Sequence, residues 1–226
     1  MHATPRSLSR ALCLTLFLSV LPLFGLSAPT PAQSVEDPAA SAFTEAEQKI
    51  LSDIRSYLDG LSGASGQFLQ ISPQGDTSTG AFLMLRPGYI RFDYAPPSQL
   101  KVVSNGKTLA VQEDPKSDVD RYPVKSTPLP LFWGETSALA ATEYVEAVFR
   151  SPGIVEIILR DPKGDTPGQL TLAFDYPRPK LRSWRVVDAQ GQMITVLLRD
   201  VQARDDLDET LFILKSRRTG PSGKRK

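Results

Sequence analysis

Between residues 44 and 61, hydrophobic positions recur with a helical period. Ile50, Ile54 and Leu58 are spaced as on one face of an α-helix. Thr44 followed by Glu47 forms the signature of a capping box at the start of that helix. Two glycines close the pattern, so the sequence predicts one amphipathic helix over residues 44–61.

From residue 67 onward the hydrophobic period changes to two. Segments of about six to eight residues alternate between hydrophobic and polar positions, and Gly, Pro, Asn or Asp separate them. This pattern is typical of antiparallel strands, and the predicted fold is mainly β (α+β). Besides the strands between residues 67 and 111, strands are expected over residues 154–160, 169–174, 181–188, 192–200 and 210–215.

The clearest hairpin spans residues 100–111 around Asn105-Gly106. An Asn-Gly dipeptide between two alternating segments favours a two-residue turn, and that turn fixes the register of the strands. The predicted pairs are Val102 with Leu109 and Leu100 with Val111.

Residues 80–94 can be sorted into two faces by the same alternation. Arg91 and Asp93 are expected to face water. The remaining positions then form an apolar face that continues across Pro87-Gly88 if the alternation survives that break. Its members are Phe82, Met84, Ile90, Phe92 and Tyr94.

Arg86 falls on the same apolar face by this parity. A guanidinium among hydrophobic side chains is costly unless it finds hydrogen-bond partners. The alternative is that Arg86 bends away at the Pro87-Gly88 break and is an ordinary surface or turn residue. The sequence leaves both interpretations open.

The alternation lapses between residues 124 and 153. Residues 126–134 are typical of a short helical turn, which begins Ser-Thr-Pro and carries four large apolar side chains, Leu129, Leu131, Phe132 and Trp133. Such a turn could plug the core permanently, or it could form a movable lid over an apolar cavity. Residues 137–149 could continue as a helix or form a further strand.

Composition places the chain among ordinary globular proteins and excludes several chemistries. The 226 residues carry a formal charge of +1, without a basic face that would suggest a nucleic-acid partner. The single histidine and single cysteine are His2 and Cys13. If the N-terminal segment is removed, no imidazole or thiol is left for catalytic triads, zinc sites or disulfides. No metal or cofactor is therefore expected.

That N-terminal segment has the features of a secretory signal peptide. Arg6 and Arg10 precede an apolar run over residues 12–26, and cleavage after Ala32 or Ala28 fits the small-residue rule. An uncleaved anchor is the alternative, although the run is short for a membrane span. The predicted organisation is a signal peptide over 1–32, a flexible leader over 33–43, one domain over 44–215 and a basic flexible tail over 216–226.

Four carboxylates could in principle serve a hydrolase of the cell envelope. Their spacing does not pair them, and carboxylates at strand ends are usually solvated. They are Glu156, Asp161, Asp175 and Asp188. The sequence therefore favours a protein that is not an enzyme.

Several short motifs, in order and spacing, resemble the LolA family of periplasmic outer-membrane lipoprotein carriers. The resemblance covers about residues 44–214. One departure is Ala110, which follows Leu109 where the family often has an aromatic residue, and another is the basic tail in place of a longer C-terminal strand extension. The matching motifs are FLQ at 68–70, LRPGYIRFDY at 85–94, PP at 96–97, VSNGKTL at 103–109, STPL at 126–129 and WRVVDAQG at 184–191.

The resemblance implies an incomplete antiparallel β-barrel with an N-terminal helix and a short helical lid over a cavity for lipoprotein acyl chains. It implies that Arg86 lies at the cavity and donates hydrogen bonds to the lid in the empty carrier. It also implies that Ile90 and Phe92 lie on the strand that lines the cavity. Together with the faces sorted above, the expected cavity residues are Phe82, Met84, Ile90, Phe92, Tyr94, Leu100, Val102, Leu109 and Val111.

The expected protein is a monomeric periplasmic chaperone. It would receive lipoproteins from an inner-membrane lipoprotein-releasing ABC transporter and deliver them to an outer-membrane receptor or to the outer membrane directly. The alternative is a related half-barrel module that senses lipid or lipoprotein in the envelope.

Overall fold

Eleven antiparallel strands form one open sheet within the described part of the computed structural model, residues 43–134, 139 and 141–215. The predicted signal peptide, nearly all of the predicted leader and the predicted tail over 216–226 lie outside these residues. None of the helices in the described part is long and apolar enough to cross a membrane. The elements are α1 (Glu45–Asp59), β1 (Gly63–Ile71), β2 (Thr77–Leu85), β3 (Tyr89–Tyr94), β4 (Lys101–Asn105), β5 (Thr108–Gln112), β6 (Asp120–Pro123), η1 (Val124–Ser126), α2 (Leu129–Trp133), η3 (Thr142–Tyr144), β7 (Val145–Ser151), β8 (Ile154–Leu159), β9 (Gln169–Asp175), β10 (Lys180–Val187), β11 (Met193–Arg204) and η4 (Glu209–Phe212).

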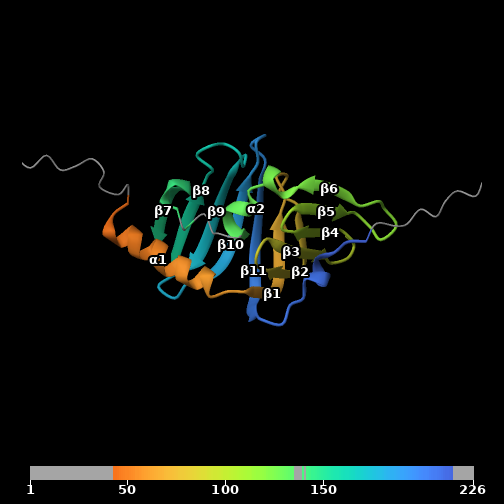
Figure 1. Ribbon diagram of the computed structural model, residues 1–226, viewed down its shortest axis with the longest axis horizontal. Helices are drawn as coiled ribbons and strands as arrows, with labels where there is room; N and C mark the ends of the chain where they lie inside the picture. Colours follow the sequence, from red (N-terminus) through yellow and green to blue (C-terminus); the bar gives the residue numbers. More distant parts are fainter. Residues whose placement is uncertain (1–42, 135–138, 140, 216–226) are drawn as a thin grey trace, which may run out of the picture. The chain divides into compact units, whose positions relative to one another are not determined.

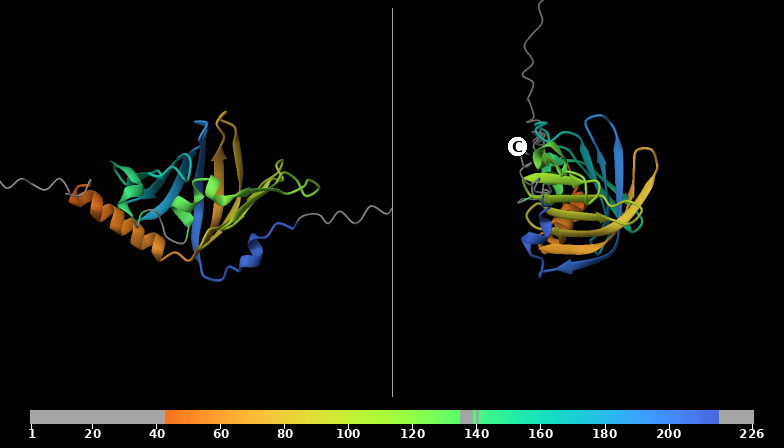
Figure 2. Two further views of the ribbon diagram at one scale, coloured as in Figure 1. Left: turned by 45° about the horizontal axis from the view of Figure 1, so that its top comes forward. Right: turned by 90° about the vertical axis from the view of Figure 1, so that its right-hand side faces the viewer.

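Neighbouring strands in the sheet are consecutive in the sequence, except that the first strand lies beside the last. Strands β1 to β6 run outward in sequence on one side, and β11 back to β7 run outward on the other, so that β1 pairs with β11. Figures 1 and 2 show the sheet curving around α1 and α2. The mainly β, half-barrel prediction is confirmed: the sheet is antiparallel and does not close between β6 and β7.

Helix α1 begins as its sequence predicts. Thr44 caps it: the Glu47 backbone N–H donates to the Thr44 hydroxyl, and the Thr44 N–H donates to the Glu47 carboxylate. The face carrying Ile54 and Leu58, both fully buried, packs on the concave side of the sheet. There the ring of Tyr57 meets the ring of Phe174 edge-on at 6.3 Å. Burial of this apolar stripe holds a helix of this length in place.

Two expectations about the β4–β5 hairpin differ from the structure. Val102 pairs with Val111, and Leu109 pairs with Ser104, because the turn falls on Gly106-Lys107, one residue later than predicted. The Asn105 side-chain oxygen accepts the N–H groups of Lys107 and Thr108 at 3.1 and 2.8 Å, which moves Asn105 from the turn centre to the strand end. Leu100 lies in the β3–β4 connection rather than in β4. The predicted register was therefore wrong, although the facing of Val102, Leu109 and Val111 is unchanged.

The segment expected as a last strand, residues 210–215, is not a strand. Residues 209–214, here called the C-terminal strap, form the 3₁₀ turn η4 followed by extended chain across the convex face of β3–β6. Phe212 is 1% exposed, and its ring lies 5.6 Å from that of Tyr89. Arg91, expected to face water, is largely covered, because its Nη1 donates to the Leu211 carbonyl at 2.7 Å.

The sequence analysis did not predict the edge strand β6, and it left the opposite edge strand β7 as one of two alternatives. β6 and β7 lie within or beside the part of the sequence where the alternation lapses. The side chains of β6 are all exposed, so this strand carries no hydrophobic period that a sequence pattern could reveal. Residues 137–149 were expected to continue as a helix or to form a strand. From Val145 onward they form a strand, β7.

Candidate functional site

Helix α2 lies on the concave face of the sheet. Its Phe132 and Trp133 side chains are each 1% exposed. The Phe132 ring lies 5.3 Å from that of Trp133 and 5.7 Å from that of Trp184 on β10. A five-residue helix has little stability of its own, so these aromatic contacts hold it there.

The sheet side of this contact is an aromatic and aliphatic surface made by neighbouring strands. The Phe92 ring meets those of Phe68 and Trp184 edge-on at 4.9 and 5.8 Å, and it stacks with that of Phe82 at 6.2 Å. Strand pairing sets these partners, because Phe82 lies opposite Phe92 and Met84 opposite Ile90. The parity predicted for residues 82–92 is therefore confirmed.

Most of the expected cavity residues share this concave face. Phe82, Met84, Ile90 and Phe92 are buried. Tyr94, Val102, Leu109 and Val111 are partly buried on the same face, toward the β6 side, and Leu100 lies off the strands. Among the expected lid residues, Leu131, Phe132 and Trp133 are buried and Leu129 is partly buried.

Around Trp133, the concave face of the described structure is occupied by these side chains. The pocket beside Trp133, between α2 and the β2–β3 and β4–β5 turns, has a volume of about 40 Å³. This is room for a few water molecules at most and far too little for an acyl chain. For an apolar chain to enter here, α2 would have to move away from the sheet.

Arg86 contacts α2 through a ring rather than through carbonyl groups. Its guanidinium carbon lies 4.8 Å from the centroid of the Trp133 ring. The Nε and Nη2 atoms of Arg86 and the Nε1 atom of Trp133 are buried and have no hydrogen-bond partner in the described structure. Burial lowers the pKa of Arg86, and the nearby Asp59 charge opposes that shift. The hydrogen bonds from Arg86 to lid carbonyls that the resemblance implied are not made by these two nitrogens.

A second connection between α2 and the sheet uses residues that the sequence analysis did not single out. The Gly88 backbone N–H donates to the Trp133 carbonyl at 2.6 Å. The Ser104 hydroxyl, which is fully buried, donates to the Gly88 carbonyl at 2.8 Å and accepts the Gly106 N–H at 3.1 Å. Gly88, Ser104 and Gly106, here called the turn clamp, thus join two turns to the end of α2.

The turn clamp requires glycine at its contact point. Gly88 has φ +77°, and a Cβ there would lie 2.6 Å from the Gly106 Cα. Both glycines belong to motifs quoted above, LRPGY and VSNGK, so the signal was present in the sequence. The sequence alone did not show that the two motifs touch.

Ser104→Ala is expected to lower the free energy of unfolding by about 1–3 kcal/mol, because it removes two hydrogen bonds, one to the carbonyl of the partly buried Gly88 and one from the N–H of the exposed Gly106. It should also loosen α2, which a change in Trp133 fluorescence in a Trp184→Phe background would report. Ser151→Ala, at an exposed serine of β7, is the matched control and should change neither quantity. If Ser104→Ala matches this control in denaturant titrations, the turn clamp does not stabilise the closed arrangement.

Tyr94 adds a polar contact at the margin of the concave face. Its hydroxyl donates to the Gln70 side-chain oxygen at 2.6 Å, and its ring packs edge-on against Phe68. Burial raises the pKa of Tyr94 to about 12. The group is therefore neutral at physiological pH and adds no charge to the apolar face.

The four candidate hydrolase carboxylates have structural partners instead of one another. Asp161 accepts the Lys163 and Thr166 N–H groups, and these bonds lower its pKa. Asp188 likewise accepts two N–H groups of its own turn. The remaining two pair with arginines: Asp175 with Arg182 at 3.1 Å and Glu156 with Arg185 at 3.9 Å. In the described part of the chain, no three acidic, His or Cys side chains gather as a metal site would require.

Comparison with known proteins places the chain in a family. It is 26% identical to the outer-membrane lipoprotein carrier protein of Azotobacter vinelandii over 184 residues, 76% of this chain and 86% of that one. It is 28% identical to the protein of the same name from Alkalilimnicola ehrlichii over 210 residues, 86% of this chain and 82% of the other. A solved LolA superfamily protein from Nitrosomonas europaea aligns with a TM-score of 0.45 at 10% identity, covering 74% of this chain and 97% of that structure. The family model described as outer membrane lipoprotein carrier protein LolA matches residues 59–215, and the chain therefore belongs to the LolA family.

Proposed function

We propose that this protein is a periplasmic carrier that binds the acyl chains of lipoproteins and shuttles them from the inner to the outer membrane. The observation that carries the proposal is the filling of an apolar concave face by one short helix of the chain itself. Phe132 and Trp133 of α2 occupy space that is lined by aromatic and aliphatic residues of β1, β2, β3 and β10. A helix of five residues can give up that position to another apolar group more readily than a strand of the sheet can.

Such a carrier answers a physical need. Exposing one methylene group to water costs about 0.8 kcal/mol, so a sixteen-carbon chain costs about 12 kcal/mol. Unassisted transfer through water is correspondingly rare. Burial in an apolar site requires no fixed geometry, and a face rich in Phe, Leu, Ile and Met accepts chains of different length. Transfer then requires only a recipient with higher affinity, and no chemical step.

In this proposal α2 is the lid, and Arg86 influences its position through Trp133. The cargo enters from an inner-membrane lipoprotein-releasing ABC transporter and leaves to an outer-membrane receptor or to the membrane directly. The curated relatives carry the name outer-membrane lipoprotein carrier protein, which supports lipoproteins as the cargo.

A pair of adjacent substitutions on strand β5 tests whether the concave face binds the chain. Val111 lies on the concave face and Gln112 on the convex face, and both are only partly buried. Val111→Glu is expected to weaken binding of a fluorescent fatty acid about tenfold, because the entering chain would have to desolvate the new charge. Gln112→Glu adds the same charge one residue away and should leave binding near that of the unmodified protein.

Equal loss in both variants would show that net charge, rather than the concave face, governs binding. No binding by the unmodified protein would count against the carrier function itself. Co-purification of lipoproteins with the protein from the periplasm, identified by mass spectrometry, gives the cargo directly.

A further inference from the structure

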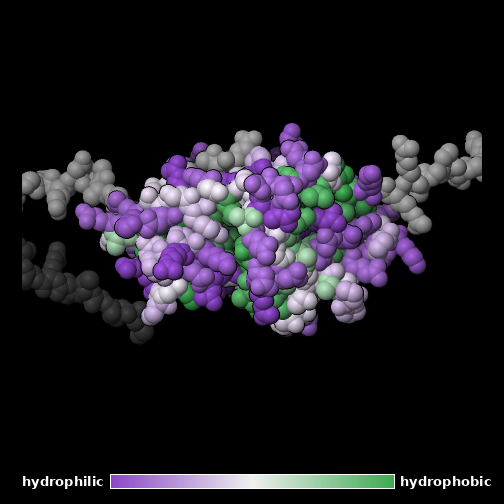
Figure 3. Space-filling model, turned by 90° about the horizontal axis from the view of Figure 1, so that it is seen from below, coloured by the Kyte–Doolittle hydropathy of each residue, from purple (hydrophilic) through white to green (hydrophobic). Residues whose placement is uncertain are grey.

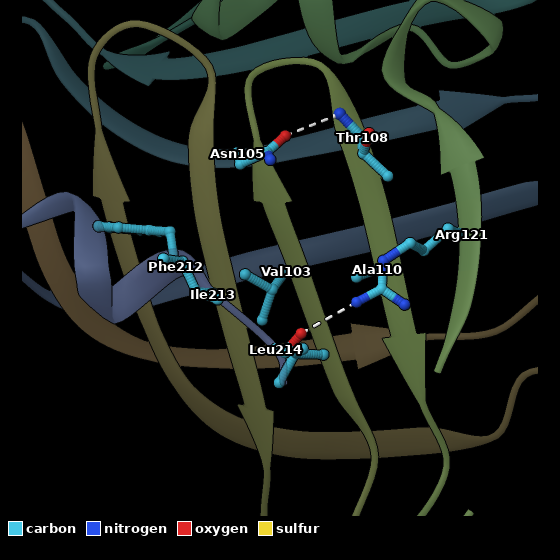
Figure 4. A pocket seen from close by; sticks show the side chains of 8 residues that line it. All are labelled: Val103, Asn105, Thr108, Ala110, Arg121, Phe212, Ile213 and Leu214. Atoms are coloured by element: carbon cyan, nitrogen blue, oxygen red, sulfur yellow. Dashed lines mark hydrogen bonds between the residues drawn. The ribbon is translucent and has the colours of Figure 1, made fainter. Parts of the chain in front are cut away.

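A row of opposed residues crosses the convex face beneath the C-terminal strap. In strand order from β3 to β6 the row consists of Arg91, Val103, Ala110 and Arg121. Val103 is 1% exposed and Ala110 is 8% exposed, although neither belongs to the concave core. Figure 4 shows residues of the strap beside these two side chains. The strap therefore gives the outer side of these strands a small apolar core of its own.

The two arginines at the ends of the row hold the strap by its backbone. Arg91 Nη1 donates to the Leu211 carbonyl at 2.7 Å, and Arg121 Nη2 donates to the Leu214 carbonyl at 3.0 Å. The strap thus crosses β3 to β6 and is fastened to the first and the last of these strands. Because β6 is a short edge strand with exposed side chains, this attachment restrains a part of the sheet that has few other contacts.

The turn clamp lies on the other side of the same backbone. Tyr89 follows Gly88 in the chain, and Val103 precedes Ser104. Neighbouring residues of a strand point to opposite faces, so a contact that holds one side chain on the convex face also positions the residue beside it. The Phe212 ring lies 5.6 Å from that of Tyr89, and Phe212 lines the same pocket as Val103. Phe212 is therefore in a position to act on the turn clamp through these two residues.

The strap is packed less completely than the sheet that it covers. Leu211 is 39% exposed and Ile213 is 55% exposed. A pocket of about 130 Å³ remains between the end of the strap and strands β4 and β5. Figure 3 shows, for one face of the molecule, that hydrophobic areas are small on a mainly hydrophilic surface. A segment that buries one large ring and leaves two aliphatic side chains in water detaches at lower cost than a strand of the sheet.

We propose that the C-terminal strap stabilises the closed position of α2 from the opposite face of the sheet, with Phe212 as the positioning residue. While the strap is seated, Tyr89 and Val103 are fixed and the turn clamp holds the end of α2. When the strap detaches, β3 to β5 bend more freely, the Gly88 N–H loses the Trp133 carbonyl, and α2 opens. This coupling rests on the proposed carrier function, in which α2 is the lid. By thermodynamic linkage, cargo that holds α2 open also loosens the strap.

A strap that only stabilised the domain would act on all parts of the sheet alike. The contacts named above all lie on β3 to β6, which are the strands that carry or adjoin the turn clamp. None of these contacts reaches β7 to β10. The effect of losing the strap should therefore be local, and a local effect can be measured.

Amide hydrogen exchange, followed by NMR on the full chain without ligand, measures it. The Gly88 N–H donates to the Trp133 carbonyl and reports the turn clamp, whereas the amides of β8 and β9 report the far half of the sheet. Phe212→Ala is expected to speed exchange at Gly88 at least about tenfold and to change the β8 and β9 amides less than about twofold. Phe212→Leu keeps an apolar side chain in place and should restore most of the slow exchange.

A milder pair of variants repeats the measurement without removing a buried ring. Arg121→Ala removes the bond to the Leu214 carbonyl and should speed exchange at Gly88 about threefold. Arg182→Ala is the matched control, because it removes a half-exposed arginine of β10 that pairs with Asp175. It should leave Gly88 exchange unchanged.

Fluorescent fatty-acid binding tests the linkage to the lid. Phe212→Ala should bind the fatty acid at least about threefold more tightly, since its closed state competes less. Saturating fatty acid should in turn speed exchange of the Leu211 N–H, which donates to the Asp208 carbonyl within the strap of the unmodified protein.

The proposal is overturned if Phe212→Ala leaves Gly88 exchange unchanged, or speeds it no more than that of the β8 and β9 amides. Faster Gly88 exchange with unchanged fatty-acid affinity would also overturn it, because the strap would then act on the turn clamp and not on the lid. If the unmodified protein binds no fatty acid, the carrier function fails. The exchange of Gly88 in the ligand-free variants still decides whether the strap positions α2.

Discussion

Replacing Phe132 with alanine is expected to lower the free energy of unfolding by about 3–5 kcal/mol and yet to strengthen acyl-chain binding. The loss of stability follows from a fully buried ring that contacts Trp133 and Trp184. The gain in binding follows because the Phe132 ring and the acyl chain compete for the same apolar face. Denaturant titration and fluorescent fatty-acid titration measure the two effects separately.

Phe174→Ala is the matched control for this prediction. Phe174 is also fully buried, but it packs against Tyr57 of α1 rather than against α2. Its replacement should cost similar stability without strengthening binding. If Phe132→Ala weakens acyl-chain binding as well as stability, then α2 is a permanent part of the core and not a lid.

Arg86→Leu is expected to make the empty, closed protein more stable. Whether this substitution raises or lowers stability depends on two opposing energies of the buried guanidinium. Each buried donor without a partner costs about 1–3 kcal/mol, and more when the group is charged. The contact between the guanidinium and the Trp133 ring contributes about 0.5–2 kcal/mol. The energetic cost of burying Nε and Nη2 without hydrogen-bond partners is larger than the energy gained from the contact with the Trp133 ring. Removing the guanidinium should therefore raise the free energy of unfolding by about 1–3 kcal/mol.

The same substitution should weaken acyl-chain binding by about 5- to 150-fold, because a more stable closed state competes more strongly with the loaded one. Arg86→Lys keeps a charge at this position and should not reproduce the gain in stability. The opposite result, a less stable Arg86→Leu protein that binds acyl chains more tightly, would show that Arg86 acts as a latch. Urea titration of the three proteins, with and without fatty acid, distinguishes the two roles.

The sequence by itself determined the elements whose periods are undisturbed. The capping box and the spacing of Ile50, Ile54 and Leu58 predicted α1, since these are local properties of one helix. Strict alternation predicted the facing of residues 82–94, because side chains in a strand must alternate whatever the strand pairs with. The short apolar turn at α2 was also visible as a pattern, and its Leu131, Phe132 and Trp133 are buried.

Contacts between distant parts of the chain were decided only by the tertiary structure. Hydrophobic period cannot place the turn of a hairpin to within one residue, and the Asn105 side chain shifted the β4–β5 register. The convex-face burial of Phe212 and the covering of Arg91 depend on the strap returning to β3 from more than a hundred residues away.

The same limit applies to the site. Arg86 on the apolar face followed from parity, but its unpartnered nitrogens and its contact with the Trp133 ring did not. The turn clamp joins two motifs whose contacting residues, Gly88 and Ser104, are 16 residues apart, and each motif alone is a weak signal. Local patterns show what one segment prefers, whereas the partners of Arg86, Gly88 and Ser104 depend on how the curved sheet brings two turns and the end of α2 together.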